Sequence, residues 1–399
     1  MPAVPAPMQA PLTLSARAQA LQPSLTLAIT AKARRLRGEG RDICSLSAGE
    51  PDFDTPAFIR RAAAEALEAG HTRYGPVAGE PALRQAIAAK LTQENGVPTR
   101  PEQVLVTNGG KQALYNLFQV LLDPGDEVLL PAPYWLSYPE MAHLAGARVR
   151  CLPTDASGGF RFSPEQLEAS ITPASRLLVL NSPSNPTGMV LSRAELEGIA
   201  AVLRRHPAVA VVCDEIYEML LSPGHEHHSL AAVAPDLAER IFIVNGFAKG
   251  WAMTGWRIGW LAGAPHVVAA ASALQSQSTS NVCSFAQFGA LAAVSASRAC
   301  VHEMAAEFSR RRSRLSDGLM AIAGLEILPP EGAFYAFPDV SAWGLDSMSL
   351  CGRLLEEVGL AVVPGAAFGD DRCIRLSCAT SQATIDDGLE RLRRFGASL

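Results

Sequence analysis

The fold of this chain is decided by the stretch Ile241-Phe242-Ile243-Val244-Asn245-Gly246-Phe247-Ala248-Lys249. Its four opening residues are apolar. Such a run fits a strand that is covered on both faces, as in a parallel sheet with helices on either side. Lys249 closes the stretch, and Arg257 comes eight residues later. A lysine amine can condense with an aldehyde, and a nearby guanidinium can hold a phosphate. The stretch therefore predicts an α/β fold and a reactive lysine beside an anion site.

Strands and helices are expected to alternate along the middle of the chain. Apolar runs predict further strands at residues 104–107, 127–130, 177–180 and 209–213. Helical spacing predicts helices at residues 111–122 and about 192–205. Open α/β sheets bind ligands at the carboxyl ends of their strands, and polar residues follow several of these runs. That edge of the sheet is therefore the predicted site.

The two ends of the chain predict a smaller α+β domain. A helix is expected from about Ser24 to Glu39, and helical spacing recurs over residues 285–319, where Arg310-Arg311-Arg312 is expected to be an exposed face. Short strands are expected at residues 333–337, 361–363 and 373–377. We predict an N-terminal arm (1–23), the N-terminal part of the small domain (24–50), a large cofactor-binding domain (51–290) and a C-terminal small domain (291–399).

Composition argues against several classes of protein. The 399 residues are 48% hydrophobic with a net charge of −5, so neither nucleic acid nor an anionic membrane is an expected partner. No apolar run reaches the length of a membrane span. The eight cysteines are scattered without a Cys-x-x-Cys pair, which is typical of reduced thiols in a cytoplasmic protein. The Ala/Pro-rich start is expected to be a flexible arm, with a transit peptide as the alternative.

Four polar clusters stand at predicted strand ends. Asn108-Gly109-Gly110-Lys111 can offer backbone N–H groups to a phosphate, and Asn185 lies in a loop fixed by prolines. Asp214 ends an apolar run, where a carboxylate needs a facing cation. Each cluster alone also fits an ordinary turn or helix cap, and Lys249 alone fits a paired lysine. Together they match pyridoxal phosphate, which needs an imine lysine, an acid at the ring nitrogen, a donor for the phenolic oxygen and a phosphate cradle.

The chain resembles the class I/II aminotransferases of fold type I, which use pyridoxal 5'-phosphate. It resembles in particular the bacterial aspartate and aspartate/prephenate branch, from about Ser24 to the C-terminus. The segments that carry the resemblance are residues 48–56, 185–188, 214–217, 253–259 and 375–377. The resemblance implies a large domain with a mostly parallel seven-stranded sheet flanked by helices, plus a smaller α+β domain.

The resemblance also implies roles around the cofactor ring. Lys249 binds the cofactor as a Schiff base and, once displaced by substrate, acts as general acid and base. Asp214 keeps the pyridine nitrogen protonated, while Asn185 and Tyr217 hold the phenolic oxygen. Trp135 resembles the aromatic residue that stacks on the ring.

The cofactor phosphate is expected to bind Arg257 and the backbone of Gly109, Gly110 and Lys111. The resemblance implies one further contact, from Tyr74 of the other subunit. A borrowed tyrosine makes a homodimer a functional requirement.

The substrate is expected to bind through its carboxylates. Arg375 would grip the α-carboxylate, with Gly49 closing over it, beside Asn185 and Trp135. In the branch that this chain resembles, a lysine at the position of Lys111 can meet the second carboxylate of aspartate or glutamate. The alternative is that this lysine is merely solvated at a helix start.

Three positions depart from the family pattern. Gly246 and Ala248 stand where many relatives carry hydroxyl residues, so one phosphate contact is lost. Relatives that use prephenate tend to carry a lysine at the position of Gln22. That departure argues against prephenate without excluding it.

The expected reaction is transfer of the amino group from L-aspartate to 2-oxoglutarate by a ping-pong mechanism. The alternatives are an aminotransferase for prephenate, alanine or aromatic substrates, a pyridoxal-phosphate β-lyase on the same scaffold, and a transcription regulator with an aminotransferase-like domain. The regulator would need a DNA-binding domain, for which the short N-terminal arm leaves no room. The segment His225-Glu226-His227-His228 is expected to be a solvated loop rather than a metal site, and no metal is expected.

Overall fold

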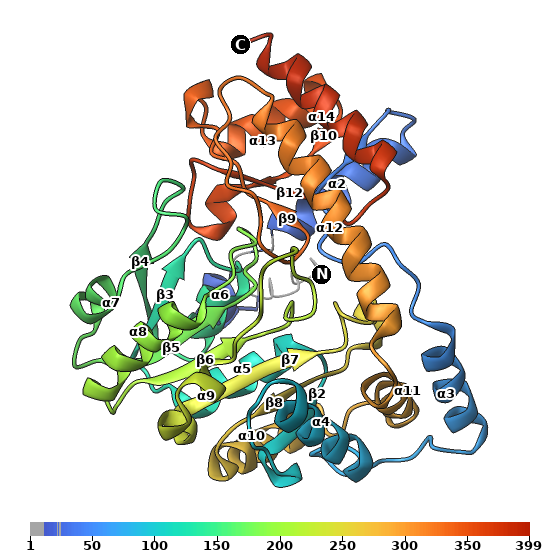
Figure 1. Ribbon diagram of the computed structural model, residues 1–399, viewed down its shortest axis with the longest axis vertical. Coiled ribbons are helices and arrows are strands. Elements are labelled where there is room, and N and C mark those ends of the chain that lie inside the picture. The colour runs from blue at the N-terminus through green and yellow to red at the C-terminus, as the bar shows by residue number, and fades with distance from the viewer. Residues whose placement is uncertain (1–11, 22, 24) are drawn as a thin grey trace, which may run out of the picture.

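The larger part of the molecule is built around a seven-stranded sheet (Figure 1). The computed structural model describes residues 12–21, 23 and 25–399, except for the side chain of Leu27. The strands lie in the order β2-β8-β7-β6-β5-β3-β4, and among these described strands only β8 runs antiparallel to its neighbours. The predicted α/β fold with a mostly parallel sheet is confirmed. The strands are β2 (Val104–Thr107), β3 (Glu127–Ala132), β4 (Arg148–Pro153), β5 (Ser175–Asn181), β6 (Ala210–Asp214), β7 (Ile241–Gly246) and β8 (Gly259–Ala262).

Both faces of the sheet are covered, because successive side chains of a strand point to opposite faces and both sets are apolar here. Val211 and Ile243 belong to the core on one face, whereas their neighbours Val212 and Val244 belong to the core on the other. The first core is completed by α3 (Ala57–Glu68), α4 (Pro81–Glu94), α7 (Pro164–Ser170), α8 (Arg193–Arg205), α9 (Leu230–Val233) and α11 (Ser284–Ser295). The second is completed by α5 (Gly110–Leu121), α6 (Ser137–Leu144) and α10 (Pro265–Ser278).

The register of the parallel strands gathers their carboxyl ends. Asn181 of β5 pairs with Asp214 of β6, and Asp214 pairs in turn with Val244 of β7. Lys249 follows only five residues after Val244. The strand pairing therefore places the loops that carry Asn185, Asp214 and Lys249 along one edge of the sheet.

The two ends of the chain meet in an apolar core that is separate from the two cores of the sheet. Cys44 and Leu360 pair between β1 (Cys44–Ser45) and β10 (Leu360–Ala361), so the N-terminal segment completes the C-terminal part. Figure 1 shows α2 beside the helices of the C-terminal part. The domain limits at residues 23, 50 and 290 stay a prediction. The remaining elements of this part are α2 (Leu25–Gly38), α12 (Ala299–Met320), β9 (Tyr335–Ala336), α13 (Ser347–Glu357), β11 (Val363–Pro364), β12 (Ile374–Ser377) and α14 (Gln382–Gly396).

The expectation that Arg310-Arg311-Arg312 forms an exposed face is wrong for two of the three arginines. Arg312 is 2% exposed and donates from Nε to Ser222 Oγ at 3.1 Å. The Arg311 side chain is 11% exposed and forms an ion pair with Asp52 at 2.7 Å. Three consecutive residues of a helix point in three directions, so a helix packed on several sides buries some of them. Through this ion pair, Arg311 connects α12 to the loop that carries Gly49 and Asp52.

The helical spacing over residues 285–319 belongs to two helices, α11 and α12, rather than one. Within the predicted arm, the short helix α1 (Ala16–Ala20) is exposed. Across the described residues, no helix combines the length and the apolar character that crossing a bilayer requires.

Candidate active site

Lys249 lies three residues beyond the end of β7 and is half-buried. Its Nζ donates a hydrogen bond to the carbonyl oxygen of Gly49 at 2.5 Å. The same nitrogen lies 5.6 Å from the ring centroid of Tyr217 and 5.5 Å from that of Phe334. Burial lowers the pKa of Lys249 to about 8, although attraction from Glu50 opposes the shift. Near neutral pH, this amine is therefore neutral, and thus nucleophilic, in a much larger share of molecules than an ordinary lysine amine.

Asp214 ends β6 and is 6% exposed. Its Oδ2 accepts a hydrogen bond from the Tyr138 hydroxyl at 2.7 Å, and its Oδ1 accepts one from the Ile216 backbone N–H at 3.3 Å. Burial raises the pKa of Asp214 to about 6, against the hydrogen bond from Tyr138, which lowers it. The sequence analysis missed Tyr138. Its position three residues after Trp135, which brings both side chains to one end of α6, is the signal that could have found it.

Tyr217 lies just beyond Asp214 and is 4% exposed. Its hydroxyl shares a hydrogen bond with the hydroxyl of Tyr335 at 2.9 Å, and the two rings meet edge to face. Burial raises the pKa of Tyr217 well above its ordinary value, so the phenol stays protonated and can donate. Tyr335, on β9, was also missed, because a strand of apolar residues gives no sign of which hydroxyl reaches a neighbouring phenol.

Arg375 and Asn185 meet although 190 residues separate them. Arg375, on β12, is 2% exposed and donates from Nη1 to Asn185 Oδ1 at 3.0 Å. Its Nη2 donates to the Ser47 carbonyl oxygen at 3.1 Å, and its Nε is buried without a partner among the described residues. The guanidinium lies 4.4 Å from the ring centroid of Tyr335. No carboxylate of the described residues pairs with this buried arginine, so it retains N–H groups for an anion.

A second candidate anion site lies at the start of α5. Gly109 has a φ of 79°, and a Cβ at that position would lie 2.8 Å from Arg257 Nη2. The cradle thus needs glycine for its conformation and for room. Gly110 and Lys111 contribute the first N–H groups of α5, which have no acceptor within the helix. Arg257 is exposed and donates to the Thr254 carbonyl oxygen at 2.9 Å.

Lys111 and Trp135 lie side by side at the mouth of this cradle. Lys111 Nζ is 4.8 Å from the Trp135 ring centroid. Although Lys111 as a residue is exposed, protein packed around its amine, followed by repulsion from Arg257, lowers its pKa. The two cations are therefore close enough to repel each other, which an anion between or beside them would relieve.

Tyr74 stands apart from the other predicted site residues. Its side chain is 94% exposed, in the segment between α3 and α4. Within one chain it contacts none of the groups around Lys249 that the structure describes. A large ring held this far into solvent is available to a second copy of the chain.

The expectation of a solvated loop at residues 225–228 is wrong for His227. His225 is exposed, but the His227 side chain is 9% exposed, with Nε2 3.3 Å from Glu215 Oε2. Ligand atoms of Glu215, Glu218 and His227 lie within 4.8 Å of one another. The cation that already faces them is Lys90, which is hydrogen-bonded to Glu218. Burial opposes charge on the imidazole, but attraction from both glutamates outweighs it and raises the pKa of His227.

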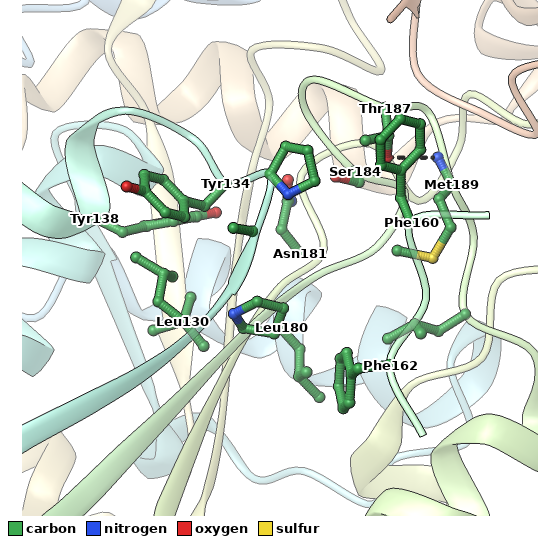
Figure 2. Close-up of a pocket in the computed structure, with 15 residues that line it drawn as sticks. Leu130, Tyr134, Tyr138, Phe160, Phe162, Leu180, Asn181, Ser184, Thr187 and Met189 are labelled. Carbon is green, nitrogen blue, oxygen red and sulfur yellow. Dashed lines mark hydrogen bonds between the residues drawn. The ribbon is translucent and has the colours of Figure 1, made fainter. Parts of the chain in front are cut away.

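A small, largely apolar pocket lies next to the site (Figure 2). Tyr134, Tyr138 and Phe160 line it together with Asn181. Lys249, Arg375 and Arg257 do not line it. Asn181 joins it to the site, because its Nδ2 donates to the Asp214 carbonyl oxygen at 2.9 Å and its Oδ1 accepts from the Asn185 backbone N–H at 2.8 Å. The pocket therefore lies behind the loops that carry the acid and the amide.

Comparison with known proteins identifies the family of this chain. The family model for aminotransferase class I and II matches residues 41–392. The chain belongs to this family. Among relatives of this aminotransferase, the aspartate/prephenate aminotransferase of Thermus thermophilus is 48% identical over 385 residues, covering 96% of this chain and 98% of the relative. The aspartate/prephenate aminotransferase of Nitrosomonas europaea is 43% identical over 392 residues, covering 96% and 99%.

Solved aminotransferase structures share the fold closely. The aspartate aminotransferase from Rhizobium meliloti superimposes with a TM-score of 0.93 at 38% identity, covering 97% of this chain and 99% of that one. The aspartate aminotransferase from Thermus thermophilus with maleate superimposes with a TM-score of 0.92 at 47% identity, covering 96% and 99%. The fold expected from the resemblance is therefore shared over nearly the full length of the aminotransferase.

Proposed function

We propose that this aminotransferase transfers the amino group of L-aspartate to 2-oxoglutarate, giving oxaloacetate and L-glutamate, with pyridoxal 5'-phosphate as cofactor. One observation carries the proposal: three cationic side chains around Lys249 pair with no carboxylate of the described residues. They are Arg257, Arg375 and Lys111, whereas about half of the arginines of the molecule form ion pairs with acids. Aspartate bound with this cofactor brings three anionic groups, one phosphate and two carboxylates. The names of the relatives support the same substrate.

The residues present fit pyridoxal phosphate. When bound, the cofactor supplies an aldehyde carbon and a protonated ring that accepts electrons from the substrate carbon. Lys249 would hold that aldehyde and Trp135 would cover the ring. Asp214 would face the ring nitrogen, because two of its roughly four acceptor positions are filled and others remain.

The phenolic oxygen and the phosphate have partners too. Tyr217 and Asn185 would donate to the phenolic oxygen. The cradle formed by Gly109, Gly110 and Arg257 would hold the phosphate, since N–H groups at a helix start and a guanidinium both favour an anion.

Lys249 has two tasks in the proposed reaction. Its pKa of about 8 leaves neutral amine available to bind the cofactor. When substrate takes its place, the free Nζ is the base that removes the α-proton of the amino acid. Its hydrogen bond to Gly49 aims the amine toward the loop that is expected to close over the substrate.

Arg375 and Lys111 would each bind one of the two carboxylates of the substrate. Arg375 retains its buried Nε–H and further N–H groups, which can grip the α-carboxylate in a bidentate manner. Lys111 carries a compact charge on a flexible stem and would meet the side-chain carboxylate. Prephenate, which also carries two carboxylates, is a second candidate acceptor because relatives at 43% and 48% identity bear its name. Gln22, which bears on prephenate, lies outside the described residues.

The active unit that we propose is a homodimer in the cytoplasm. The exposed ring of Tyr74 would reach the phosphate in the partner's site. A mixture of Lys249→Ala and Tyr74→Phe subunits tests this, because one site in each hybrid would contain both native residues. Recovery of activity on mixing is expected, and no recovery would contradict a shared site.

Eight free cysteines support a reducing compartment such as the cytoplasm.

A panel of amino donors tests the substrate assignment. The purified protein with pyridoxal phosphate should transfer amino groups from aspartate and glutamate to 2-oxoglutarate, and prephenate is tested as an acceptor. Lys111→Ala should lower kcat/KM for aspartate by about 10- to 100-fold, the size expected for a lost contact between charged groups, and should leave alanine nearly unchanged. Equal losses for both donors would contradict the role of Lys111. Pyruvate release from cysteine-type substrates without any acceptor would favour the β-lyase instead.

A further inference from the structure

Asp214 is held by one side chain of the described residues, the phenol of Tyr138. The hydroxyl of Tyr138, which is 1% exposed, donates to Oδ2 at 2.7 Å. The other oxygen accepts only from the backbone N–H of Ile216, among the described residues, at the longer distance of 3.3 Å. The shorter bond therefore comes from α6, which lies outside the strand that carries the acid. Tyr138 fixes where the carboxylate points.

The environment of Asp214 otherwise disfavours its charge. The strand end is buried, and the neighbouring carboxylate of Glu215 repels it, while the positive charge that attracts it is Lys249. That positive charge is lost whenever the lysine nitrogen is unprotonated. A phenol that donates to the carboxylate does not depend on the state of Lys249. Burial, and then Asp214 itself, raise the pKa of Tyr138 well above its ordinary value, so this donor keeps its proton.

Tyr138 also touches the residue expected to cover the cofactor ring. Its ring meets Trp135 at 81° with centroids 5.3 Å apart, and its backbone N–H donates to the Trp135 carbonyl oxygen at 3.0 Å. The turn that leads into α6 therefore fixes the positions of two groups, the Trp135 indole and, through Tyr138, the Asp214 carboxylate. The acid would lie at the edge of the ring, and the indole over its face.

We propose that Tyr138 is a positioning residue of the reaction: its phenol keeps Asp214 ionised and aimed so that a free lone pair of the carboxylate faces the ring nitrogen of the cofactor. The inference deepens the proposed function and rests on it. It assigns to Tyr138 no contact with the reacting atoms. Its effect passes through Asp214, and therefore depends on the charge of that residue.

The chain offers a matched control in Tyr134. Tyr134 and Tyr138 line the same pocket and are labelled near each other in Figure 2. The phenol of Tyr134, however, faces Cys151 rather than Asp214. Replacing either tyrosine by phenylalanine removes one hydroxyl and keeps the ring, so the two variants differ chiefly in which partner loses its donor.

The test compares Tyr138→Phe with Tyr134→Phe in two measurements. The first is the Kd of the cofactor-free protein for pyridoxal phosphate. It should rise by about tenfold or more in Tyr138→Phe, the size expected for losing a hydrogen bond to a charged group, and by less than about twofold in Tyr134→Phe. The second is the ¹⁵N NMR signal of ring-labelled cofactor, which should move toward the unprotonated position only in Tyr138→Phe. Indistinguishable results for the two variants would overturn the inference.

A double-mutant cycle separates positioning from general damage to the fold. In an Asp214→Asn background there is no carboxylate charge to stabilise, so adding Tyr138→Phe should change the cofactor Kd by less than about twofold. The same loss in both backgrounds would show that Tyr138 acts without Asp214 and would overturn the inference. Failure of the native protein to bind pyridoxal phosphate is a different result. It would refute the proposed function, and this inference with it.

Discussion

Arg375 donates a hydrogen bond to Asn185 at 3.0 Å, so a strand of the C-terminal part touches a loop at the edge of the large sheet. Both side chains are buried, at 2% and 6% exposure. Two residues with different expected tasks, one toward the substrate and one toward the cofactor, therefore share a contact. A substrate carboxylate that engages Arg375 acts next to the group that is expected to hold the phenolic oxygen.

Replacing Arg375 by lysine should weaken substrate binding and spare cofactor binding. Lysine keeps the charge but loses the planar fork that grips a carboxylate at two points. We expect kcat/KM for aspartate to fall by about 10- to 100-fold, while the Kd for pyridoxal phosphate stays within about twofold. The control is Arg372→Lys, because the Arg372 side chain is 47% exposed and pairs with Asp370. Equal losses in the two variants would contradict the assignment of Arg375.

Cofactor uptake should depend on pH through Lys249. Burial lowers the pKa of this amine to about 8, and only the neutral amine attacks an aldehyde. The rate at which cofactor-free protein takes up pyridoxal phosphate should therefore rise with pH and level off above about 8. Attraction from Glu50 raises the pKa of Lys249, so Glu50→Gln should move the midpoint to lower pH. The surface variant Glu39→Gln is the control, and a midpoint that stays fixed in Glu50→Gln would contradict the prediction.

Replacing Asp214 by asparagine should stabilise the cofactor-free protein while impairing cofactor binding. The pKa of Asp214 is raised from 3.8 to about 6, chiefly by burial. The unfolded chain therefore loses its proton first as the pH rises. The free energy of unfolding falls between about pH 4 and pH 6 and stays lower above that range.

The size of that effect follows from the shift. A change of about two pKa units corresponds to about 3 kcal/mol at neutral pH. Denaturant unfolding of Asp214→Asn and native protein, both without cofactor, measures the difference. It should be close to zero below about pH 4. A variant that is less stable than the native protein at neutral pH would show that this acid is not strained by burial.

His227 should stabilise the fold most strongly at lower pH. Its pKa is raised by Glu215 and Glu218, so the stabilisation is complete below the ordinary histidine pKa and is lost as the pH rises through the raised value. At slightly acidic pH, His227→Gln should cost about 3 kcal/mol, as for removal of one partner from a buried ion pair. His228→Gln is the control, since its side chain is 29% exposed and only 4.0 Å from an exposed glutamate. If the loss in free energy of unfolding caused by His227→Gln does not become smaller at alkaline pH, the ionic role of His227 is contradicted.

The sequence predicted the helices and strands better than it predicted the contacts between side chains. Apolar runs located the strands that became β2, β6 and β7, because a strand buried on both faces must be apolar throughout. Lys249 and Asp214 stood out because a charged residue at the end of such a run needs a partner. Tyr138 and Tyr335 did not stand out, because a tyrosine in an apolar segment looks like core until its hydroxyl has a neighbour.

The solvated loop and the exposed arginines were misjudged for the same reason. Glu215 and Glu218 lie near His227 only after folding, and Lys90 joins them from α4, so the charges that keep an imidazole buried are spread along the chain. Arg312 likewise finds Ser222 and Ala333 from α12. Local polarity predicts exposure only where no distant partner satisfies the polar group.

By itself, the sequence determined the α/β class and predicted the lysine, acid, amide and glycine cluster of the candidate site, because burial and chemistry restrict which residues can follow an apolar strand. The tertiary structure alone decided which groups face them. Strand register placed Asn181 beside Asp214, α6 brought Tyr138 to the carboxylate, and β12 carried Arg375 to Asn185. Hydrogen bonds act over about 3 Å, whereas these partners are separated by tens to hundreds of residues, so only the folded chain could choose them.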